Sequence, residues 1–408
     1  MSTSERTRPV PRLPLLSRDA ASLRIIEMLA RRLRCGHLHL TLPDGREIVS
    51  HGREAGPHAQ LTIRRARFAR RMLFGGALGF AEAYLDGDCE TDDLVAVFEL
   101  AARNEAALGG VLRGRGASRA VARLAHRLRP NTRRGARRNI AAHYDLGNAF
   151  YELWLDPSMT YSSAVFDRSD QALEAAQYEK YRRMAAIADL RPEHRVLEIG
   201  CGWGGFAEYA AREIGCRVTA ITISEAQHAY AARRITAAGL SERVDVRLID
   251  YRDLDGAFDR IVSIEMIEAV GETWWPAYFA KLRELLTAGG RAALQAITID
   301  DSCWDTYRRG ADFIQRYIFP GGMLPAPRVL RETVREAGLT PAGEDSYGLH
   351  YAETLRRWRH AFEHAWPRIA GQGFDERFLR MWRYYLAYCE AGFRVGRIDL
   401  RQLSLTKI

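Results

Sequence analysis

Four glycines between positions 200 and 205 form the part of the sequence best suited to holding a small molecule. They stand in the stretch RVLEIGCGWGGFAEYAAREIGC, between a strand-like run and a helix-like run. Glycine lets the backbone turn sharply and leaves space for a ligand against it, as at the strand-to-helix junctions that bind nucleotides. The spacing therefore predicts a nucleotide-binding loop, without identifying the nucleotide, at Gly200, Gly202, Gly204 and Gly205.

Glu198 lies two residues before the first of these glycines, and its charge helps to decide between two candidate ligands. A dinucleotide would place its pyrophosphate at the N-terminus of the following helix, where a carboxylate repels it. S-adenosylmethionine instead presents a cationic amino group, which a carboxylate attracts. Asp250, after the third strand-like run, is suited to accept a hydrogen bond from an adenine amino group. These two acids favour S-adenosylmethionine.

The second strand-like run lacks the acid that commonly binds ribose hydroxyls, because it ends in AITIS. Thr222, Ser224 and Gln227 are the polar residues expected to supply that contact.

The residues that position this loop belong to an alternating pattern. Short runs rich in β-branched residues (RVLEI, CRVTAIT, VDVRLI, FDRIVSI and RAALQAI) alternate with helical stretches such as 224–239 and 274–290. This alternation predicts an α/β fold with a doubly wound, mainly parallel sheet, in which ligands bind at the C-terminal ends of the strands. With S-adenosylmethionine as the ligand, it is the Rossmann-like arrangement of a class I methyltransferase.

The remaining sequence suggests four segments. Residues 1–19 are expected to be flexible, and residues 20–105 to form a small mixed domain with a helix at 21–33 and a turn at Asp44-Gly45 between two strands. Residues 106–140 form an arginine-rich linker, and residues 141–408 the catalytic domain.

The net charge of +9 is local to residues 111–138, which hold ten arginines and no acid, because the rest of the chain sums to −1. In SRAVARLAHRLR, leucine and valine lie on one helical face and arginine on another, as in a helix on an anionic membrane. A solvated linker helix explains the pattern equally well. No apolar run is long enough to span a membrane and the N-terminus lacks a signal-peptide core, so we expect a cytoplasmic protein. The six cysteines form no CxxC pair, and no metal site is expected.

Several longer segments closely resemble the cyclopropane fatty acid synthase family in content and order. They include HYDLGNAFYELWLDPSMTYSSAVF (143–166), LEIGCGWGG, EMIEAVG, RYIFPGGMLP (316–325) and YYLAYCEAGFRVGRIDL. The resemblance implies transfer of the S-adenosylmethionine methyl group to the double bond of an unsaturated acyl chain in a membrane phospholipid. Proton removal by a bound bicarbonate then closes a cyclopropane ring. It also implies a protein peripheral to the inner face of the membrane, and a homodimer is an expectation.

Carried over position by position, the resemblance assigns site residues. Tyr161 and Ser162 would adjoin S-adenosylmethionine, with Tyr251 and the loop residues already named. Bicarbonate would be held by Glu268, Ile297 and Tyr351, and Cys389 in the last matching segment joins the candidate catalytic residues.

Two of the family's bicarbonate positions differ in this sequence. Ser163 stands where the family commonly has cysteine, and Gln295 where it commonly has histidine. Both can hydrogen-bond an anion, but glutamine cannot become cationic. Methyl transfer is therefore better supported than ring closure, and loss of a different proton would give a methyl-branched, still unsaturated chain.

The methylated chain passes through a carbocation, which aromatic faces stabilise without attacking it. Candidates, each with ordinary core packing as the alternative, are Tyr161, Trp274, Trp275, Tyr278, Tyr317 and Phe319. Three other functions remain open: a small-amine methyltransferase, a nucleic-acid methyltransferase suggested only by the basic linker, and a non-catalytic lipid-binding protein. No nucleic-acid partner is expected, since no RNA-binding or base-flipping motif is present.

Overall fold

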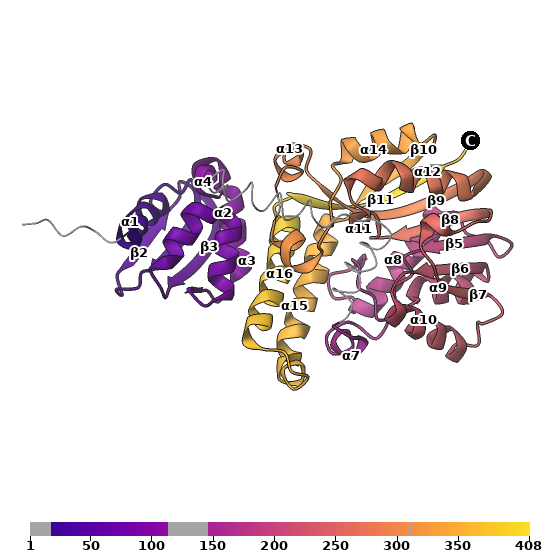
Figure 1. Cartoon of the computed structure of the whole chain (residues 1–408), viewed down its shortest axis with the longest axis horizontal. Helices are drawn as coiled ribbons and strands as arrows, with labels where there is room; N and C mark the ends of the chain where they lie inside the picture. Colours follow the sequence, from indigo (N-terminus) through magenta and orange to yellow (C-terminus); the bar gives the residue numbers. More distant parts are fainter. Residues whose placement is uncertain (1–17, 113–145, 311) are drawn as a thin grey trace, which may run out of the picture.

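The computed structural model describes residues 18–112, 146–310 and 312–408, which form two domains (Figure 1). The expected flexible segment lies outside the described residues up to position 17, and the first helix begins at Arg18, just before the expected boundary. Most of the arginine-rich segment, including its amphipathic stretch, also lies outside them. Within the described part of the chain, no helix has the length and apolar character needed to cross a membrane.

The N-terminal domain is a four-stranded mixed sheet covered by helices. Its strands lie in the order β2-β1-β3-β4, with β1 antiparallel to β2 and parallel to β3. The turn between β1 and β2 contains Gly45 at φ +82°, a conformation that suits glycine. The elements are α1 (Arg18–Ala30), β1 (Cys35–Thr41), β2 (Glu47–His51), β3 (Glu54–Ile63), α2 (Arg67–Leu85), β4 (Cys89–Glu90), α3 (Leu94–Arg103) and α4 (Glu105–Leu112).

The second domain is built on a seven-stranded sheet of order β10-β11-β9-β8-β5-β6-β7. The pairs from β9 to β7 are parallel, and β11 and β10 are added antiparallel at one side. The predicted doubly wound, mainly parallel sheet is thus confirmed. Its strands are β5 (Arg195–Ile199), β6 (Arg217–Thr222), β7 (Val244–Leu248), β8 (Phe258–Ile264), β9 (Leu286–Ile299), β10 (Thr340–Ser346) and β11 (Ile398–Thr406).

Helices lie on both faces of this sheet. The helical stretch expected at 274–290 is shorter than predicted, because α12 ends at Leu285 and β9 begins at Leu286. The helices are α7 (Asn148–Tyr151), α8 (Leu173–Ile187), α9 (Gly205–Tyr209), α10 (Glu225–Ala237), α11 (Ile267–Val270), α12 (Trp275–Leu285), α13 (Trp304–Tyr307), α14 (Pro327–Glu336), α15 (Gly348–Ala370) and α16 (Glu376–Arg394).

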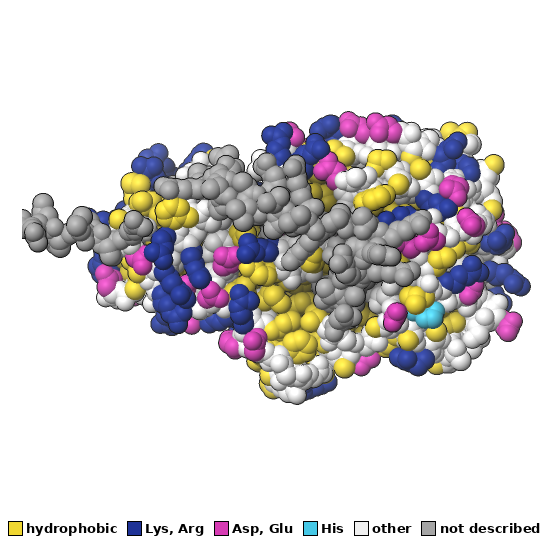
Figure 2. Space-filling model, in the orientation of Figure 1, with side chains coloured by type: hydrophobic (Ala, Val, Ile, Leu, Met, Phe, Trp, Pro, Cys, Tyr) yellow, Lys and Arg dark blue, Asp and Glu magenta, His cyan; other side chains and the backbone are white. Residues whose placement is uncertain are grey.

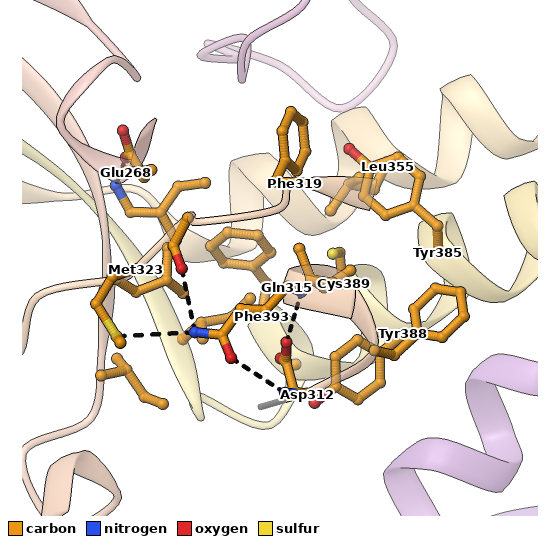
Figure 3. A pocket seen from close by; sticks show the side chains of 18 of the residues that line it. Glu268, Asp312, Gln315, Phe319, Met323, Leu355, Tyr385, Tyr388, Cys389 and Phe393 are labelled. Carbon is orange, nitrogen blue, oxygen red and sulfur yellow. Dashed lines mark hydrogen bonds between the residues drawn. The ribbon is translucent and has the colours of Figure 1, made fainter. Parts of the chain in front are cut away.

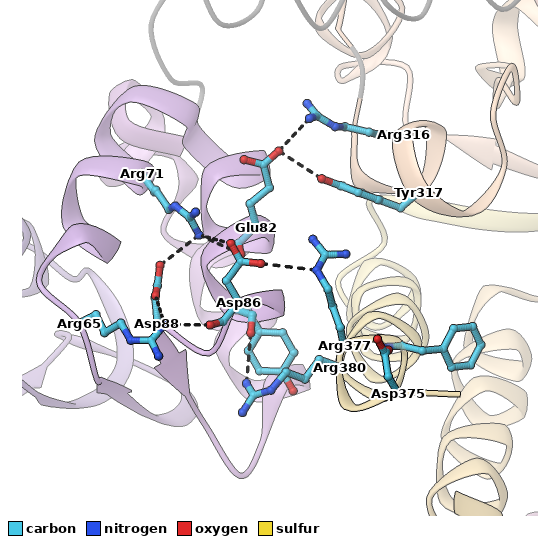
Figure 4. Close-up of polar contacts among 12 residues, drawn as sticks. Arg65, Arg71, Glu82, Asp86, Asp88, Arg316, Tyr317, Asp375, Arg377 and Arg380 are labelled. Atoms are coloured by element: carbon cyan, nitrogen blue, oxygen red, sulfur yellow. Dashed lines mark hydrogen bonds and ion pairs between the residues drawn. The ribbon is translucent and has the colours of Figure 1, made fainter. Parts of the chain in front are cut away.

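Helix α16 carries the contact between the domains (Figure 1). The Tyr384 ring packs against Phe98 of α3, with ring centroids 4.8 Å apart. Polar contacts also cross the boundary (Figure 4): Glu82 of α2 forms an ion pair with Arg316 at 3.0 Å, and Arg380 of α16 donates to the Tyr84 carbonyl at 3.1 Å. Hydrophobic side chains are also visible over α15 and α16 in Figure 2. The two domains therefore share one boundary, at which a common cavity can form.

Candidate active site

The glycine loop leaves β5 in a conformation that places open space beside the backbone. Gly200, Gly202 and Gly204 have φ of +81°, +52° and +83°. A Cβ atom added at Gly202 would meet no atom within 4 Å, whereas one added at Gly204 would lie 3.1 Å from Ala231 on α10. Gly202 thus leaves room for a ligand. Gly204, expected to contact the ligand, instead allows close helix packing and does not line the cavity.

A cavity of about 1280 Å³ extends from this loop to the N-terminal domain. Gly202 and Thr222 line its polar end, and Leu33 and Phe98 line its far end in the other domain. Figure 3 shows the middle, with Glu268 on one side, Tyr385 and Tyr388 of α16 on the other, and Phe319 and Cys389 between them. One continuous space therefore joins the predicted cofactor loop to an apolar chamber.

Glu198 and Lys180 are buried charged groups near the loop. Glu198 is 3% exposed, lines the cavity, and its Oε2 has no hydrogen-bond partner among the described residues. Burial raises the pKa of Glu198 to about 8, although the Lys180 ammonium opposes this. Lys180 donates to Ser162 Oγ at 2.7 Å, and burial lowers its pKa to about 7. An unsatisfied buried carboxylate at this position favours a cationic ligand group.

The residues expected beside the ribose form a connected group after β6. Thr222 donates to Gln227 Oε1 at 3.0 Å, and both side chains line the cavity. Ser224 instead caps α10, where its hydroxyl accepts from the Gln227 amide, and it does not line the cavity. The polarity missing from β6 is therefore supplied by Thr222 and Gln227.

The residues expected near the adenine lie where β7 ends. Asp250 lines the cavity but is held by its own segment, because Arg252 binds its carboxylate with Nη2 to Oδ2 at 2.6 Å. Tyr251 also lines the cavity and packs edge-on against Tyr278, with centroids 5.3 Å apart. Burial raises the pKa of Tyr251 to about 12, so the phenol is neutral at physiological pH.

Tyr161 and Ser162 come from the loop before α8 and lie on the cavity wall. Tyr161 shares a hydrogen bond of 2.8 Å with Tyr385 of α16, and its ring packs against Trp358 with centroids 5.3 Å apart. The Ser162 carbonyl accepts from the Gln177 side-chain amide at 2.9 Å. These contacts fix the loop on α8 and α16.

Glu265, which the sequence analysis did not single out, is the centre of the polar network on the cavity wall. One carboxylate oxygen accepts from the Ser163 amide at 2.8 Å and from Gln295 Nε2 at 2.8 Å. The other accepts from the Tyr351 hydroxyl at 2.7 Å. Glu265 and Tyr351 line the cavity, whereas Ser163 and Gln295 are 0% and 1% exposed and lie outside its lining. The signal available in the sequence was a second acid three residues before Glu268, in SIEMIE.

Glu268 engages the other group expected to hold bicarbonate. The Ile297 amide donates to Glu268 Oε1, and Glu268 Oε2 is buried without a hydrogen-bond partner among the described residues. Burial, together with the nearby Glu265 carboxylate, raises the pKa of Glu268 to about 8. The donors assigned to bicarbonate thus already bind carboxylates: Ser163, Gln295 and Tyr351 bind Glu265, and Ile297 binds Glu268. The residues present do not fit a bicarbonate.

The structure corrects part of the aromatic expectation. Trp274, Trp275, Tyr278 and Tyr317 do not line the cavity, whereas Tyr161 and Phe319 do. Tyr278 is fully buried and bonds Ser263 at 2.8 Å, while Tyr317 donates to Glu82 of the other domain at 3.2 Å. The aromatic residues of α16 that line the cavity were missed, because sequence order does not reveal which helix closes the cavity. Burial raises the pKa of the Cys389 thiol beside them, so it is neutral.

Comparisons with known proteins agree with this arrangement. The model of the family described as mycolic acid cyclopropane synthetase matches residues 131–403. A tuberculostearic acid methyltransferase of Mycobacterium tuberculosis is 41% identical over 98% of this chain and 94% of its own length. A cyclopropane-fatty-acyl-phospholipid synthase of Escherichia coli is 36% identical over 86% of this chain and 88% of its own.

Solved structures match about two thirds of the chain. The cyclopropane synthase MmaA2 from Mycobacterium tuberculosis superposes with a TM-score of 0.63 at 31% identity, over 66% of this chain and 98% of that one. The mycolic acid cyclopropane synthase CmaA1, complexed with SAH and CTAB, gives 0.62 at 31% identity with the same coverage. The resemblance of the sequence to this family is thereby confirmed. The protein is an S-adenosylmethionine-dependent methyltransferase that belongs to the cyclopropane synthase family.

Proposed function

We propose that the protein transfers the methyl group of S-adenosylmethionine to the double bond of an unsaturated fatty acyl chain of a membrane phospholipid. The observation that carries this proposal is the single cavity that joins the glycine loop to an apolar chamber shared by both domains. A small amine would not need an apolar chamber that extends into the N-terminal domain of the protein.

The dimensions of the cavity suit two ligands. Its volume of about 1280 Å³ exceeds the roughly 300–1,000 Å³ typical of a pocket for one small molecule. The cofactor end offers polar groups and close backbone approach, whereas the far end is lined by side chains such as Leu33, Leu61 and Phe98. An acyl chain would gain about 0.8 kcal/mol for each methylene group buried there.

The residues at the cofactor end can hold S-adenosylmethionine, which supplies an electrophilic methyl group. Glu198 has an unpaired carboxylate oxygen for the cationic amino group, and Gly202 leaves space against the loop backbone. Thr222 and Gln227 supply polar groups for the ribose.

The remaining cavity residues act on the acyl chain. An alkene is a weak nucleophile, so its alignment with the methyl group and the exclusion of water are the main contributions of the protein. Tyr161, Phe319 and Tyr385 surround the middle of the cavity with aromatic faces that stabilise a cation. Proton loss from the transferred methyl group gives a cyclopropane, and proton loss from the neighbouring chain carbon gives a methyl-branched unsaturated chain.

The test is methyl transfer to vesicles of phospholipid with monounsaturated chains, using S-adenosylmethionine labelled in the methyl group. We expect the label in the acyl chains, and mass spectrometry with NMR distinguishes ring from branch. Vesicles with saturated chains are the matched control and should remain unlabelled. Absence of label in unsaturated lipid, with methylation of small amines, would overturn the proposal.

The same proposal places the substrate at a bilayer. The sequence of residues 111–138 supports it, because clustered arginines attract anionic headgroups by about 1 kcal/mol each. Replacing Arg119, Arg123, Arg127, Arg133 and Arg134 with Gln should weaken sedimentation with anionic vesicles and spare cofactor affinity. Unchanged sedimentation would assign the segment to a plain linker.

A further inference from the structure

Glu265 occupies the hydrogen-bond donors around which the second step of the reaction must occur. The Ser163 amide, the Gln295 side-chain amide and the Tyr351 hydroxyl all donate to its carboxylate, at 2.7–2.8 Å. Ser163 and Gln295 lie behind Glu265, outside the cavity lining, so its side chain separates them from any anion in the cavity. This arrangement is a preformed carboxylate site whose occupant belongs to the chain itself.

The backbone at Glu265 supports a specific role for this side chain. Its φ is +51°, in the left-handed region that glycine adopts readily and that costs other residues about 1–2 kcal/mol. Glu265 lies at the C-terminal end of β8, the edge at which ligands bind in such sheets. Strained residues of this kind persist where the surrounding structure holds them in place, and they cluster at active sites. Here Ser163, Gln295 and Tyr351 hold the carboxylate.

The charges around the site also disfavour a free anion. Glu265 and Glu268 lie close enough that the charge of Glu265 raises the pKa of Glu268. The nearby Lys180 is bound to Ser162 Oγ rather than to either carboxylate. A bicarbonate entering here would meet two acidic side chains, and its expected donors would already be engaged.

We infer that the Glu265 carboxylate is the base that removes the proton from the methylated acyl chain, in the place that the family resemblance gives to bicarbonate. This inference rests on the proposed function. It makes proton removal independent of bicarbonate, and it makes Ser163, Gln295 and Tyr351 positioning residues for Glu265.

The step balances without any further reactant. The double bond of the acyl chain uses its π electrons to form a bond to the methyl carbon, while the electrons of the broken carbon–sulfur bond remain on sulfur. The chain then carries a positive charge on the neighbouring carbon. Glu265 accepts a proton either from the transferred methyl group, whose C–H electrons then close the three-membered ring onto the cationic carbon, or from a chain carbon bonded to the cationic carbon, whose C–H electrons form a new double bond. The proton leaves Glu265 for solvent after the product departs.

The ionisation of Glu265 fits this role. Burial raises its pKa, whereas the hydrogen bonds from Tyr351, Ser163 and Gln295 lower it, in that order of size. Burial thus makes the carboxylate a stronger base than in water, and the donors keep its ionised form accessible.

The test compares the wild type with Glu265→Gln and Glu265→Gly in buffers freed of carbon dioxide and in buffers with added bicarbonate. Wild-type turnover should be equal in both. Glu265→Gln should lose at least about 100-fold in turnover, as expected for a lost general base. Glu265→Gly relieves the backbone strain and leaves the three donors facing open space, so its turnover should be low without bicarbonate and rise when bicarbonate is added. The exposed Glu213→Gln is the matched control and should behave as the wild type.

A binding measurement separates this inference from the proposed function. Titration of ¹³C-labelled bicarbonate, followed by NMR, should show binding to Glu265→Gly and none to the wild type. Bicarbonate-dependent lipid methylation by the wild type, or full turnover by Glu265→Gln, would overturn the inference and leave the proposed function standing. A wild type that methylates no lipid would overturn the proposed function, and wild-type binding of bicarbonate would then still overturn the inference. Calorimetry with S-adenosylmethionine confirms that each variant is folded.

Discussion

Gln402 donates a hydrogen bond of 2.8 Å to the side-chain carbonyl of Gln295 and thereby fixes which end of that amide faces the active site. The two residues are directly paired across β11 and β9, and both side chains are 1% exposed. Because the Gln295 oxygen is engaged by Gln402, its amino group must point toward Glu265, where it donates at 2.8 Å. A residue on an antiparallel strand near the end of the chain thus orients the carboxylate of the proposed base.

Gln402→Leu should weaken this orientation while preserving the size of the side chain. The Gln295 oxygen would be left buried without a donor, at a cost of about 1–3 kcal/mol in the free energy of unfolding. We expect turnover to fall by about tenfold, with S-adenosylmethionine affinity unchanged, because Gln402 lies outside the cavity lining. Chemical denaturation, steady-state kinetics and calorimetry measure the three quantities. A loss of cofactor affinity that parallels the loss of turnover would show a general structural defect instead.

The sheet was predictable from the sequence because most of its parallel strands are short, largely buried runs rich in β-branched residues; in β7 only Val244 is buried. RVLEI and FDRIVSI became β5 and β8 nearly as expected. The end of α12 was not predictable, because LLTA continues the helical pattern and it is the pairing of Leu286 with Phe258 of β8 that begins the strand there. Tertiary pairing here overrides local preference.

The glycine loop provides a matched test of cofactor binding. Gly202→Ala and Gly239→Ala both place a Cβ in open space at positive φ, +52° and +69°, so both should lose about 1–2 kcal/mol of stability through backbone strain. Only Gly202 lines the cavity. Gly202→Ala should therefore raise the dissociation constant of S-adenosylmethionine by about tenfold or more, whereas Gly239→Ala should not. Equal affinities, measured by calorimetry, would show that the cofactor does not approach Gly202.

The group of donors around Glu265 could not be predicted from the sequence. Ser163, Gln295 and Tyr351 were identifiable one by one. They converge on Glu265 only when the loop before α8, strand β9 and helix α15 pack around the end of β8. Glu265 was overlooked because its importance lies in that convergence rather than in its neighbours along the chain. The aromatic residues of α16 were missed for the same reason.

Binding of S-adenosylmethionine should release a proton near pH 7. Burial raises the pKa of Glu198 to about 8, so in the cofactor-free protein this carboxyl is mostly protonated at pH 7. A cationic amino group beside Glu198 favours its ionised form, which lowers the pKa and expels the proton. The newly ionised Glu198 raises the pKa of Lys180 and so opposes the direct effect of the cation on that ammonium, which leaves Glu198 as the source of the release.

Calorimetric titration in buffers of different ionisation enthalpy measures this release. The proton release should diminish above about pH 9, where Glu198 is already ionised before the cofactor binds. Glu198→Gln should bind S-adenosylmethionine more weakly and lose most of the proton release. Proton uptake, or an unchanged release in Glu198→Gln, would place the cationic group of the cofactor elsewhere.

The last prediction concerns the boundary between the domains (Figure 4). Glu82 of the N-terminal domain faces Arg316 at 3.0 Å and Tyr317 at 3.2 Å, and it also lines the shared cavity. Glu82→Arg should repel Arg316 and open the boundary. Because the Glu82 and Arg316 side chains are both partly exposed, losing their ion pair should weaken the contact between the domains by about 1 kcal/mol or less. Arg316→Glu should have the same effect, and the double charge swap should restore the contact. If the chamber holds the acyl chain, each single variant should raise the KM for phospholipid and leave the affinity for S-adenosylmethionine unchanged, with recovery in the swap. Equal phospholipid KM values in all four proteins, across low and moderate salt, would show that docking of the N-terminal domain does not shape the acyl site.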